Sequence, residues 1–513
     1  MKKIFLALLL AAMLASPAAA QTILYIPADN RPVSFGDVVD TARATGVDIL
    51  VPPEAALGNR TEPGDPDKLW AWLTDHSSEA DAIVVSGDSL LYGSLVASRT
   101  HHIPQAVLQE RLASFAALKD RNPALRIYVY NTIMRTPQFS AGGVEPPYYE
   151  TYGPSIFRLT ALQDKQELQP LSRTEAADLE KLQTTLPAEA LSDWFDRRSK
   201  NYSANSRLIG YVKEGLVDYL ILGRDDCSPY SQSHKESRHL NREAAGLSAS
   251  RYASFPGADQ LGMVLLTRAI NDYTFRVPIV RVFYTPGAGG QTVPTYEDVP
   301  FEQTIVAHLA AAGGIPLATA KPDIYLAVNT PENGITREAN TPANQPLPGK
   351  ALLAFVDMVE QKLAAGERVT IADIAFANGA DNALMNELAR RGLLYKLDAY
   401  SGWNTASNTL GYAIGQGMLA KTMSPEAKNK LLTVRFLDDW AYQSNIRQEV
   451  AAQILYPQGG SYFRLDGLSQ QLTNETQRRI EQFADTHLTA YRPSSLRVSF
   501  PWNRMFEVKV EVE

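Results

Sequence analysis

Two adjacent carboxylates, Asp225 and Asp226, follow the apolar run YLILG (219–223) and one arginine. Two neighbouring carboxylates at the end of a buried strand cannot both be ionised without partners, so one of them is expected to have a raised pKa. An acid that keeps its proton beside an ionised carboxylate suits glycoside hydrolysis, because the acid protonates the leaving oxygen while the carboxylate stabilises charge developing on the sugar. Asp225 and Asp226 are therefore the predicted catalytic residues.

The adjacency of the pair limits its mechanism. Neighbouring side chains on one strand end point in different directions, so they cannot flank a glycosidic bond as a separated acid and nucleophile do. They fit substrate-assisted cleavage, in which one Asp orients a 2-acetamido group as nucleophile and its neighbour is the general acid. The alternative is a structural pair that caps a helix or contacts Arg31, Arg99 or Arg135.

The run YLILGRDD is similar to the strand and paired Asp of bacterial and animal O-GlcNAc hydrolases, barrel enzymes of the substrate-assisted mechanism. This similarity covers only the short run itself. It implies that Asp225 orients the acetamide and that Asp226 is the acid.

Polar residues also follow most of the other predicted strands. In a parallel α/β architecture the loops at the carboxyl ends of the strands form the active face. An Asp, Asn or Arg after nearly every strand therefore indicates a functional site, in which aromatic rings can stack on pyranose faces and polar groups can bind hydroxyls. The residues predicted to bind substrate are Asp29, Arg31, Asp88, Tyr92, Asn131, Arg135, Tyr230, Trp403 and Asn404.

The elements that must position these residues are βα units. Short β-branched runs alternate with helical patterns, which is typical of a parallel sheet. They favour a TIM-barrel-like (β/α)8 fold with insertions, and the alternative is two doubly wound α/β domains divided near residues 255–300. The predicted strands cover 23–27, 48–52, 82–87, 126–132, 219–223, 324–330, 369–376 and 395–400, with further candidates at 280–285 and 316–320.

The N-terminal segment, residues 1–20, has two lysines, a short apolar core and the small-residue site Ala18-Ala19-Ala20. This pattern predicts a cleavable signal peptide and hence a periplasmic or secreted protein. The apolar core is shorter than the roughly 20 residues of a membrane-spanning helix, and no later segment reaches that length. No membrane span is expected in the mature chain.

The mature chain is expected to hold a barrel-like catalytic domain over residues 21–425. A helical insertion is predicted at about 160–215, where the sequence is polar and helix-forming. A small C-terminal extension of helical and β structure is predicted over 426–513. The turn-rich stretch 330–349 is too long for a connector and is either a lid or a mobile excursion.

Composition disfavours several classes of partner and cofactor. The net charge of −7 argues against nucleic-acid binding. The chain has one cysteine, Cys227, so it has no intramolecular disulfide, and its 7 histidines lack the spacing of a structural zinc site. The glycines of TPGAGGQT match neither a dinucleotide fingerprint nor a phosphate loop, so no cofactor is expected.

The motifs YIPADNRP, SGDSLLYGSLVASR, YNTIMR, GRDDCSPY, PGADQLG and YSGWNTASNTLG resemble those of a bacterial family catalogued as domain of unknown function 4127. The resemblance covers most of the mature chain and implies no activity. It adds Arg99 and Asp259 to the positions of interest, because both lie inside these motifs.

Three functions follow from these observations. The first is an exported glycoside hydrolase that acts on a carbohydrate, specifically an N-acetylhexosaminide. The second is a periplasmic binding protein whose two domains close on a small polar ligand or glycan fragment. The third is a metal-dependent hydrolase in which Asp29, Asp88, Asp225 and Asp226 hold Mg²⁺ or Ca²⁺. Topology separates the first two, because a closed ring of strands favours the enzyme and two hinged sheets favour the binding protein.

Overall fold

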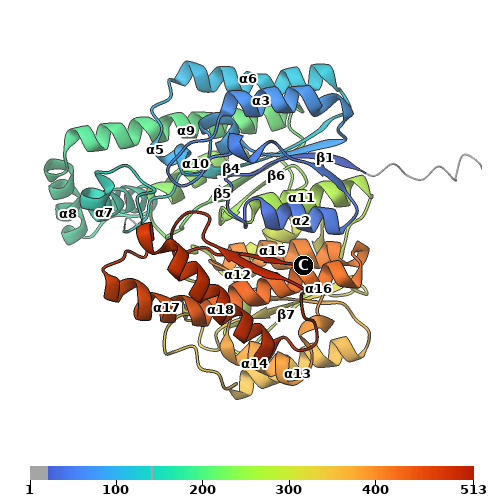
Figure 1. Ribbon diagram of the computed structural model, residues 1–513. Coiled ribbons are helices and arrows are strands. Elements are labelled where there is room, and N and C mark those ends of the chain that lie inside the picture. The colour runs from blue at the N-terminus through green and yellow to red at the C-terminus, as the bar shows by residue number, and fades with distance from the viewer. Residues whose placement is uncertain (1–20, 140–141) are drawn as a thin grey trace, which may run out of the picture.

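Two parallel β-sheets, with helices on both faces of each, make up most of the protein (Figure 1). The computed structural model describes residues 21–139 and 142–513, so the predicted signal peptide lies outside the described residues. The protein is a mixed α/β protein. Among the described residues, no helix is both long enough and apolar enough to cross a membrane.

The first sheet has six parallel strands in the order β2-β1-β3-β4-β5-β6. Alternate side chains of these strands enter two different apolar clusters, because helices cover both faces. Helices α2 (Gly36–Ala44) and α11 (Leu261–Tyr273) pack on one face, and α3 (Pro66–His76), α6 (Gln105–Arg121), α9 (Ala188–Glu214) and α10 (Gln232–Glu243) pack on the other. The strands are β1 (Thr22–Ile26), β2 (Asp48–Leu50), β3 (Ala82–Ser86), β4 (Arg126–Ile133), β5 (Tyr219–Arg224) and β6 (Tyr252–Pro256).

The second sheet has five parallel strands in the order β13-β11-β9-β7-β8. Helices α12 (Phe301–Ala311) and α15 (Ala406–Leu419) pack on one face, and α13 (Lys350–Ala364) and α14 (Asn382–Arg390) pack on the other. The strands are β7 (Ile279–Tyr284), β8 (Ile315–Pro316), β9 (Ile324–Asn329), β11 (Val369–Asp373) and β13 (Ala399–Ser401).

Both sheets reverse direction at the same place in their own strand order. The first strand of each sheet, β1 or β7, lies between the second and the third, so the chain moves one way and then the other. In open α/β sheets, ligands bind beyond the carboxyl ends of the strands at such a switch point. The fold therefore points to two loop regions, those after β1 and β3 and those after β7 and β9.

This topology corrects the predicted (β/α)8 barrel. A barrel needs every strand to pair with neighbours on both sides, whereas β2, β6, β8 and β13 are edge strands of two open sheets. Buried parallel strands with covering helices give the same apolar runs in either fold, so the repeat that favoured a barrel could not distinguish the two. The alternative of two doubly wound units fits, because β6 ends at Pro256 and β7 begins at Ile279.

Two strands differ from the predicted pattern. Strand β6 was not predicted, because its sequence YASFP lacks the apolar run of a central strand and ends in proline, which only an edge position tolerates. The predicted strand 395–400 begins instead as a 3₁₀ turn (Leu394–Lys396), and the strand itself starts at Ala399.

One apolar core joins the two sheets. It includes Ile23 and Tyr25 of β1 and Leu326 and Val328 of β9, and the layers between them are α2 and α11 from the first unit and α12 and α15 from the second. Figure 1 shows these helices between the two sheets, and α11 packs directly on α15. A large apolar interface of this kind opposes free hinge motion between the units.

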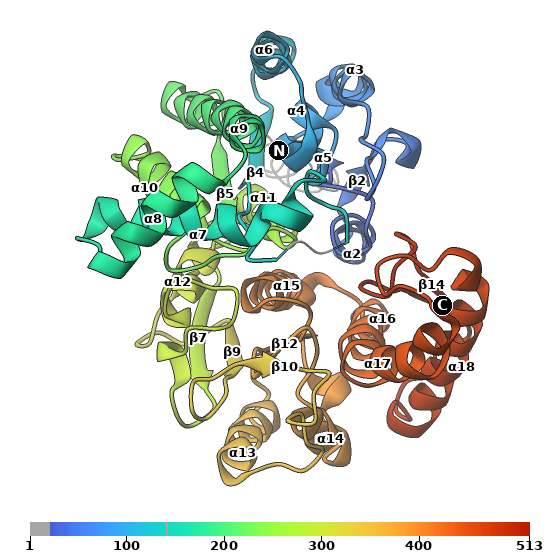
Figure 2. The same ribbon diagram turned by 90° about the vertical axis from the view of Figure 1, so that its left-hand side faces the viewer.

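Three helices lie between β4 and β5. They are α7 (Tyr149–Leu168), α8 (Arg173–Thr185) and α9, and they share a small core that includes Ile156, Leu179 and Trp194. Helix α8 begins with a capping box, in which Ser172 and Glu175 satisfy each other's backbone N–H groups. In Figure 2 these helices and the C-terminal segment lie on opposite sides of the molecule.

The C-terminal segment packs on both units. Helix α16 (Pro425–Arg435) continues as a π-helical stretch (Phe436–Ile446) into α17 (Arg447–Val450), and α18 (Ser469–His487) is followed by an antiparallel pair, β14 (Leu496–Ser499) and β15 (Lys509–Val512). Arg435 pairs with Asp37 of α2 at 3.0 Å. Trp502 Nε1 donates to Asn30 Oδ1 at 2.8 Å, so this segment reaches the loop after β1.

The stretch 330–349 is attached to the second unit. Its short strand β10 (Arg337–Glu338) pairs in parallel with β12 (Phe376–Ala377). The Asn344 side chain donates to the carbonyls of Ala339 and Ala380, both at 2.9 Å. These bonds fix the middle of the stretch beside the end of β11.

Candidate active site

The loop after β1 begins the site. Arg31 is buried, and its guanidinium donates to Asp29 Oδ2 at 2.7 Å and to Asp259 Oδ1 at 2.6 Å. Asp29 leaves β1 at the switch point, and Asp259 follows β6 at the start of α11, so the arginine links the middle of the sheet to its edge. Charge-assisted pairs of this kind fix side-chain positions closely.

The second unit joins this group through Asn404. Its side-chain amide donates to Asp259 Oδ2 at 3.3 Å, and its backbone lies in the left-handed region with φ 65°. Asp259 in turn donates its backbone N–H to Asn408 Oδ1 at 3.2 Å. Burial raises the pKa of Asp259, while the Arg31 charge opposes that rise. Asp259 is thus held from both sheets.

The predicted catalytic pair has two arginine partners. Arg99 contacts Asp225 Oδ2 at 2.5 Å, and Arg135 contacts Asp226 Oδ2 at 2.7 Å. Glu145 lies between the two arginines, because its Oε1 accepts from Arg135 Nε at 2.6 Å and is 4.0 Å from Arg99 Nη1. The contacts with Arg99 and Arg135 that were expected for a structural pair are therefore present in the structure.

The two carboxylates of the pair differ in exposure and in backbone geometry. The side chain of Asp225 is 13% exposed and that of Asp226 is 27% exposed. Burial raises the pKa of Asp226 to about 6, with Arg135 lowering it and Asp225 raising it further. Asp226 also has φ 45°, a left-handed conformation that is rare for a residue with a side chain. Asp226 is thus a partly exposed acid that titrates close to neutral pH.

Three arginines face five carboxylates in this group, which we call the charged cluster. Asp225 also raises the pKa of Asp259, so the groups after β5 and β6 interact electrostatically. The excess of carboxylates favours a neutral or cationic ligand over an anionic one. The charged cluster consists of Asp29, Arg31, Arg99, Arg135, Glu145, Asp225, Asp226 and Asp259.

Left-handed residues gather around the charged cluster. Seven residues other than glycine have positive φ among the described residues. Three of them, Tyr296, Asn378 and Asn404, are joined by hydrogen bonds, in part through Glu338. A fourth, Asp226, directly precedes Cys227, whose N–H donates to the Tyr296 carbonyl. Backbone conformations of this kind cost free energy and concentrate at functional sites.

Asp88 and Asn131 lie beneath the surface. Asp88 Oδ2 accepts the Thr132 N–H at 3.0 Å, and burial raises the pKa of Asp88 to about 7. Asn131 donates to Asn205 Oδ1 at 2.7 Å and is 1% exposed. Asp88 ties α4 (Gly87–Tyr92), the short helix after β3, to β4, and Asn131 ties β4 to α9. Both side chains are buried, so the structure places them in support of the site and not in contact with solvent.

The three aromatic residues predicted to stack on a sugar are not exposed at the charged cluster. Trp403 is 4% exposed and belongs to the core between the sheets, where it packs on Phe506. Tyr92 is 3% exposed and stacks on His101 with ring centroids 4.5 Å apart. Tyr230 contacts α7, where its hydroxyl accepts from Gln169 Nε2 at 2.8 Å. For Tyr92 and Trp403, burial favours the packing interpretation over ligand stacking, whereas Tyr230 is half-buried and its role in binding stays a prediction.

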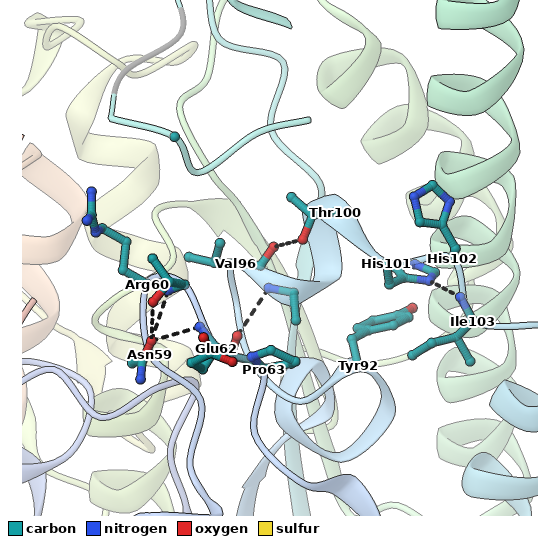
Figure 3. A pocket seen from close by; sticks show the side chains of 14 residues that line it. Asn59, Arg60, Glu62, Pro63, Tyr92, Val96, Thr100, His101, His102 and Ile103 are labelled. Atoms are coloured by element: carbon teal, nitrogen blue, oxygen red, sulfur yellow. Dashed lines mark hydrogen bonds between the residues drawn. The ribbon is translucent and has the colours of Figure 1, made fainter. Parts of the chain in front are cut away.

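Tyr92 borders a pocket of about 610 Å³ on the outer side of α5 (Ala97–Thr100) (Figure 3). Arg60, Pro63, Val96 and His101 are among its other lining residues. Arg99 of the same helix does not line it and reaches Asp225 instead. The pocket and the charged cluster are therefore separate features.

The four carboxylates considered for a metal each have another partner. Asp29 contacts Arg31, Asp88 contacts a backbone N–H, and Asp225 and Asp226 contact two arginines. In the part of the chain that the structure describes, no group of three or more His, Cys, Asp or Glu side chains is arranged to hold a metal ion. The chemistry considered below uses the carboxyl groups themselves.

Four residues at the site were not among the predicted site residues. Glu145 and Tyr296 lie in loops and Glu338 lies in the short strand β10, all outside the motifs, and Asn378 was noted only as a residue following a strand. The one sequence signal was Asn378-Gly379, a pair of residues that favours left-handed turns. Glu145 and Tyr296 had no comparable signal, because only the fold brings them to the cluster.

The profile of the family described as protein of unknown function (DUF4127) matches residues 23–511. The chain belongs to this family. Membership confirms the resemblance drawn from the motifs, whereas the similarity to O-GlcNAc hydrolases has no support from the comparisons. No curated protein matches this chain.

Among solved structures, one similar to this family member is a complex between a UDP-glucosyltransferase from Polygonum tinctorium, capable of glucosylating indoxyl, and 3,4-dichloroaniline. It is 10% identical, with 92% of this chain and 100% of that chain covered and a TM-score of 0.18. A likeness of this size carries no inference about fold or function.

Proposed function

We propose that this protein is an exported glycoside hydrolase in which Asp226 is the general acid and Asp225 orients the substrate. The observation that carries the proposal is the asymmetry of the pair. Asp226 is the more exposed carboxylate and has a pKa of about 6, whereas Asp225 is more buried and accepts a 2.5 Å bond from Arg99. A general acid works best when its pKa lies near the working pH.

The charge of the site supports a neutral sugar as substrate. A phosphate or carboxylate on the ligand would meet the excess of carboxylates in the charged cluster, whereas hydroxyl and acetamide groups can bind to carboxylates and arginines alike. Adjacent carboxylates also fit substrate-assisted cleavage of an N-acetylhexosaminide, because Asp225 would accept from the acetamide N–H while Asp226 protonates the leaving oxygen.

The rigid connection between the two sheets supports catalysis over ligand binding alone. The apolar core that runs from β1 to β9 holds the two sheets together, so the charged cluster and Asn404 are positioned before a ligand arrives. Preorganised donors and acceptors stabilise a transition state without reorganising during the reaction.

The second candidate is an exported binding protein for a small polar ligand or glycan fragment. The observation that favours it is topology, because two open sheets replace the closed ring expected for a barrel enzyme. Their switch points carry Asp29 and Arg31 on one side and the loops after β7 and β9 on the other. This candidate predicts binding without turnover.

The proposal is tested with a panel of neutral aryl and benzyl glycosides that includes N-acetyl-β-D-glucosaminides. We expect Asp226→Asn to lower kcat/KM for the benzyl glycoside by about 10²–10⁴-fold, the usual contribution of a general acid. It should lower kcat/KM much less for a dinitrophenyl glycoside, because that leaving group departs without a proton. Asp225→Asn should lower both.

A matched control is Asp178→Asn, which also removes a carboxylate from an arginine pair but lies on α8, and 36% of its side chain is exposed. It should keep full activity. If wild-type protein cleaves no glycoside in the panel, or if both catalytic variants remain fully active, the hydrolase assignment is wrong. Calorimetric binding of a sugar without turnover would favour the second candidate.

A further inference from the structure

The loops at the switch point of the second sheet bring a tyrosine and a glutamate together. Tyr296 lies in the connection from β7 to α12, and Glu338 lies in the connection from β9 to α13. Tyr296 donates its hydroxyl to Glu338 Oε1 at 3.1 Å. These are the connections at which an open α/β sheet binds its ligand.

We propose that Tyr296, anchored by Glu338, is the aromatic platform on which the sugar ring next to Asp226 stacks. This inference rests on the proposed function and adds a specificity-determining residue to the same site. In this proposal both sheets contribute to the ligand site: the first sheet carries the carboxylates, and the second sheet carries the aromatic surface.

The position of Tyr296 next to the catalytic pair is set by the backbone. Its carbonyl accepts the Cys227 N–H at 3.0 Å, and Cys227 directly follows Asp226. Burial and Glu338 raise the pKa of the Tyr296 phenol, and the charge of Asp226 raises it further. The charge of Asp226 therefore acts on the Tyr296 phenol.

The ring of Tyr296 is available to a ligand. Tyr296 is 40% exposed, whereas Tyr92 and Trp403, the rings predicted for this role, are 3% and 4% exposed. An aromatic ring with one anchored hydroxyl and an open face combines an apolar surface with a fixed orientation. Glu338 fixes that orientation, and its Oε2 accepts from Asn378 Nδ2 at 2.8 Å.

The left-handed backbone at Tyr296, φ 72°, is held by its neighbours. Glu297 accepts the Ser407 N–H at 2.9 Å near the start of α15, and Asp298 pairs with Arg224 at 2.7 Å at the end of β5. A strained conformation persists only where surrounding contacts determine it, and such strain is found where a side chain must be aimed.

The hydrogen bonds continue from Tyr296 back to the charged cluster. Asn378 donates its backbone N–H to the Asn404 carbonyl at 2.8 Å, and Asn404 contacts Asp259. The stretch 330–349 thus presents Glu338 as a fixed support, since β10 pairs with β12. This arrangement assigns a positioning role to a stretch whose sequence predicted a lid or a mobile excursion.

The test compares Tyr296→Asn and Tyr296→Phe. Asparagine tolerates the left-handed backbone and removes the ring, whereas phenylalanine keeps the ring and removes only the bond to Glu338. The matched control is Phe275→Asn, because Phe275 also has positive φ (52°), is 91% exposed and lies at the far end of α11. Tyr296→Gly, which also relieves backbone strain, is the second ring-deletion variant.

Two measurements are made on the full-length mature protein. KM and kcat are measured with the cleaved N-acetylglucosaminide, and the Kd of neutral triacetylchitotriose is measured by calorimetry in an Asp226→Asn background. We expect Tyr296→Asn and Tyr296→Gly to raise KM and Kd by about tenfold, the effect of losing one good stacking contact. Tyr296→Phe should stay within about twofold, and Phe275→Asn should be unchanged, with equal thermal midpoints throughout.

The outcomes separate the two proposals. If wild-type protein cleaves the sugar and both ring-deletion variants keep its KM and Kd, the stacking role is overturned and the hydrolase proposal stands. If Tyr296→Phe loses as much affinity as Tyr296→Asn, the hydroxyl and not the ring makes the contact, which also overturns the platform. If wild-type protein neither cleaves nor binds any sugar, both proposals fail.

Discussion

Asn404 donates its side-chain amide to Asp259 across 145 residues of sequence and so connects the carboxyl edges of the two sheets. Asp259 also accepts a hydrogen bond from Arg31, the arginine that pairs with Asp29 at the first switch point. A change in the relative position of the two units would break this contact. The site is therefore assembled by the whole fold and not by either sheet alone.

The pH dependence of activity follows from the raised pKa of Asp226. A general acid must carry its proton, so kcat/KM should fall about tenfold per pH unit as pH rises above about 6. Activity should therefore be greatest on the acidic side of neutrality. A pH profile of kcat/KM for a benzyl glycoside checks this, and a profile that is flat from pH 5 to 8 would contradict the acid role. In Asp226→Asn that limb should be absent.

Removing the shared cation of the first switch point should destabilise the protein. Arg31→Met leaves the buried carboxylates of Asp29 and Asp259 without their partner, which costs about 3–5 kcal/mol in comparable buried pairs. Arg158→Met is the control, because Arg158 and Asp178 are 47% and 36% exposed, and should cost less than about 1 kcal/mol. Urea unfolding at pH 7 measures both. Equal losses would show that the buried Arg31 pairs contribute no more to stability than an exposed pair does.

The buried carboxyl groups predict how stability depends on pH. Burial raises the pKa of Asp88 and Asp373 to about 7 and that of Glu297 and Asp439 to about 8. In this range the native state binds protons that the unfolded chain has already lost, so the free energy of unfolding should fall as pH rises from 6 to 8. Urea unfolding at several pH values tests this.

Asp88→Asn should make the same decline shallower, because it removes one of the protons that the native state alone retains. Below about pH 6.5 a buried histidine opposes this trend, since burial lowers the pKa of His308 to about 3 and the unfolded chain then gains a proton that the native state refuses. That one proton does not outweigh the four that the buried carboxyl groups retain, so as pH falls stability should keep rising, less steeply, until the same carboxyl groups protonate in the unfolded chain at about pH 4. A free energy of unfolding that rises steadily to pH 8 would contradict this assignment.

Gly223 fixes the approach of β5 to the start of α11. A Cβ at this position would lie 2.5 Å from the Gly257 carbonyl oxygen and 2.5 Å from a Leu261 methyl carbon. Gly223→Ala should therefore destabilise the protein by about 1–3 kcal/mol. It should also lower activity, because Asp225 lies only two residues further along the chain and would be displaced. Gly467→Ala, with nothing within 4 Å of the added carbon, should be neutral or slightly stabilising. Equal stability of the two variants would show that the close approach is unimportant.

Much of the fold could be predicted from local patterns. Each of the eight predicted runs overlaps a strand, because buried parallel strands require apolar, β-branched sequences. The closure of the sheet could not be predicted, because the order β2-β1-β3 depends on which strands pair and not on their composition. Strand β6 lacked the pattern because an edge strand tolerates serine and proline.

The same division holds for the site. Asp225, Asp226, Arg31 and Arg135 are placed together because polar residues after parallel strands share one edge, and the motifs already contained them. Two of the predicted aromatic partners, Tyr92 and Trp403, are buried, since a ring near a strand end packs into the core as readily as it faces a ligand. Trp403 packs into the core between the two sheets. Whether such a ring is exposed depends on which helices cover it, and no local motif predicts that.

The apolar layer of α11 and α15 has a consequence for dissecting this protein. Each of these helices has buried residues on nearly every face, including Met263, Val264 and Leu265 on α11 and Leu410 and Ile414 on α15. A fragment ending before β7 or starting there would leave one such helix uncovered and would aggregate. Co-expression of the two fragments should restore a soluble pair, so the halves are complementary parts and not autonomous modules.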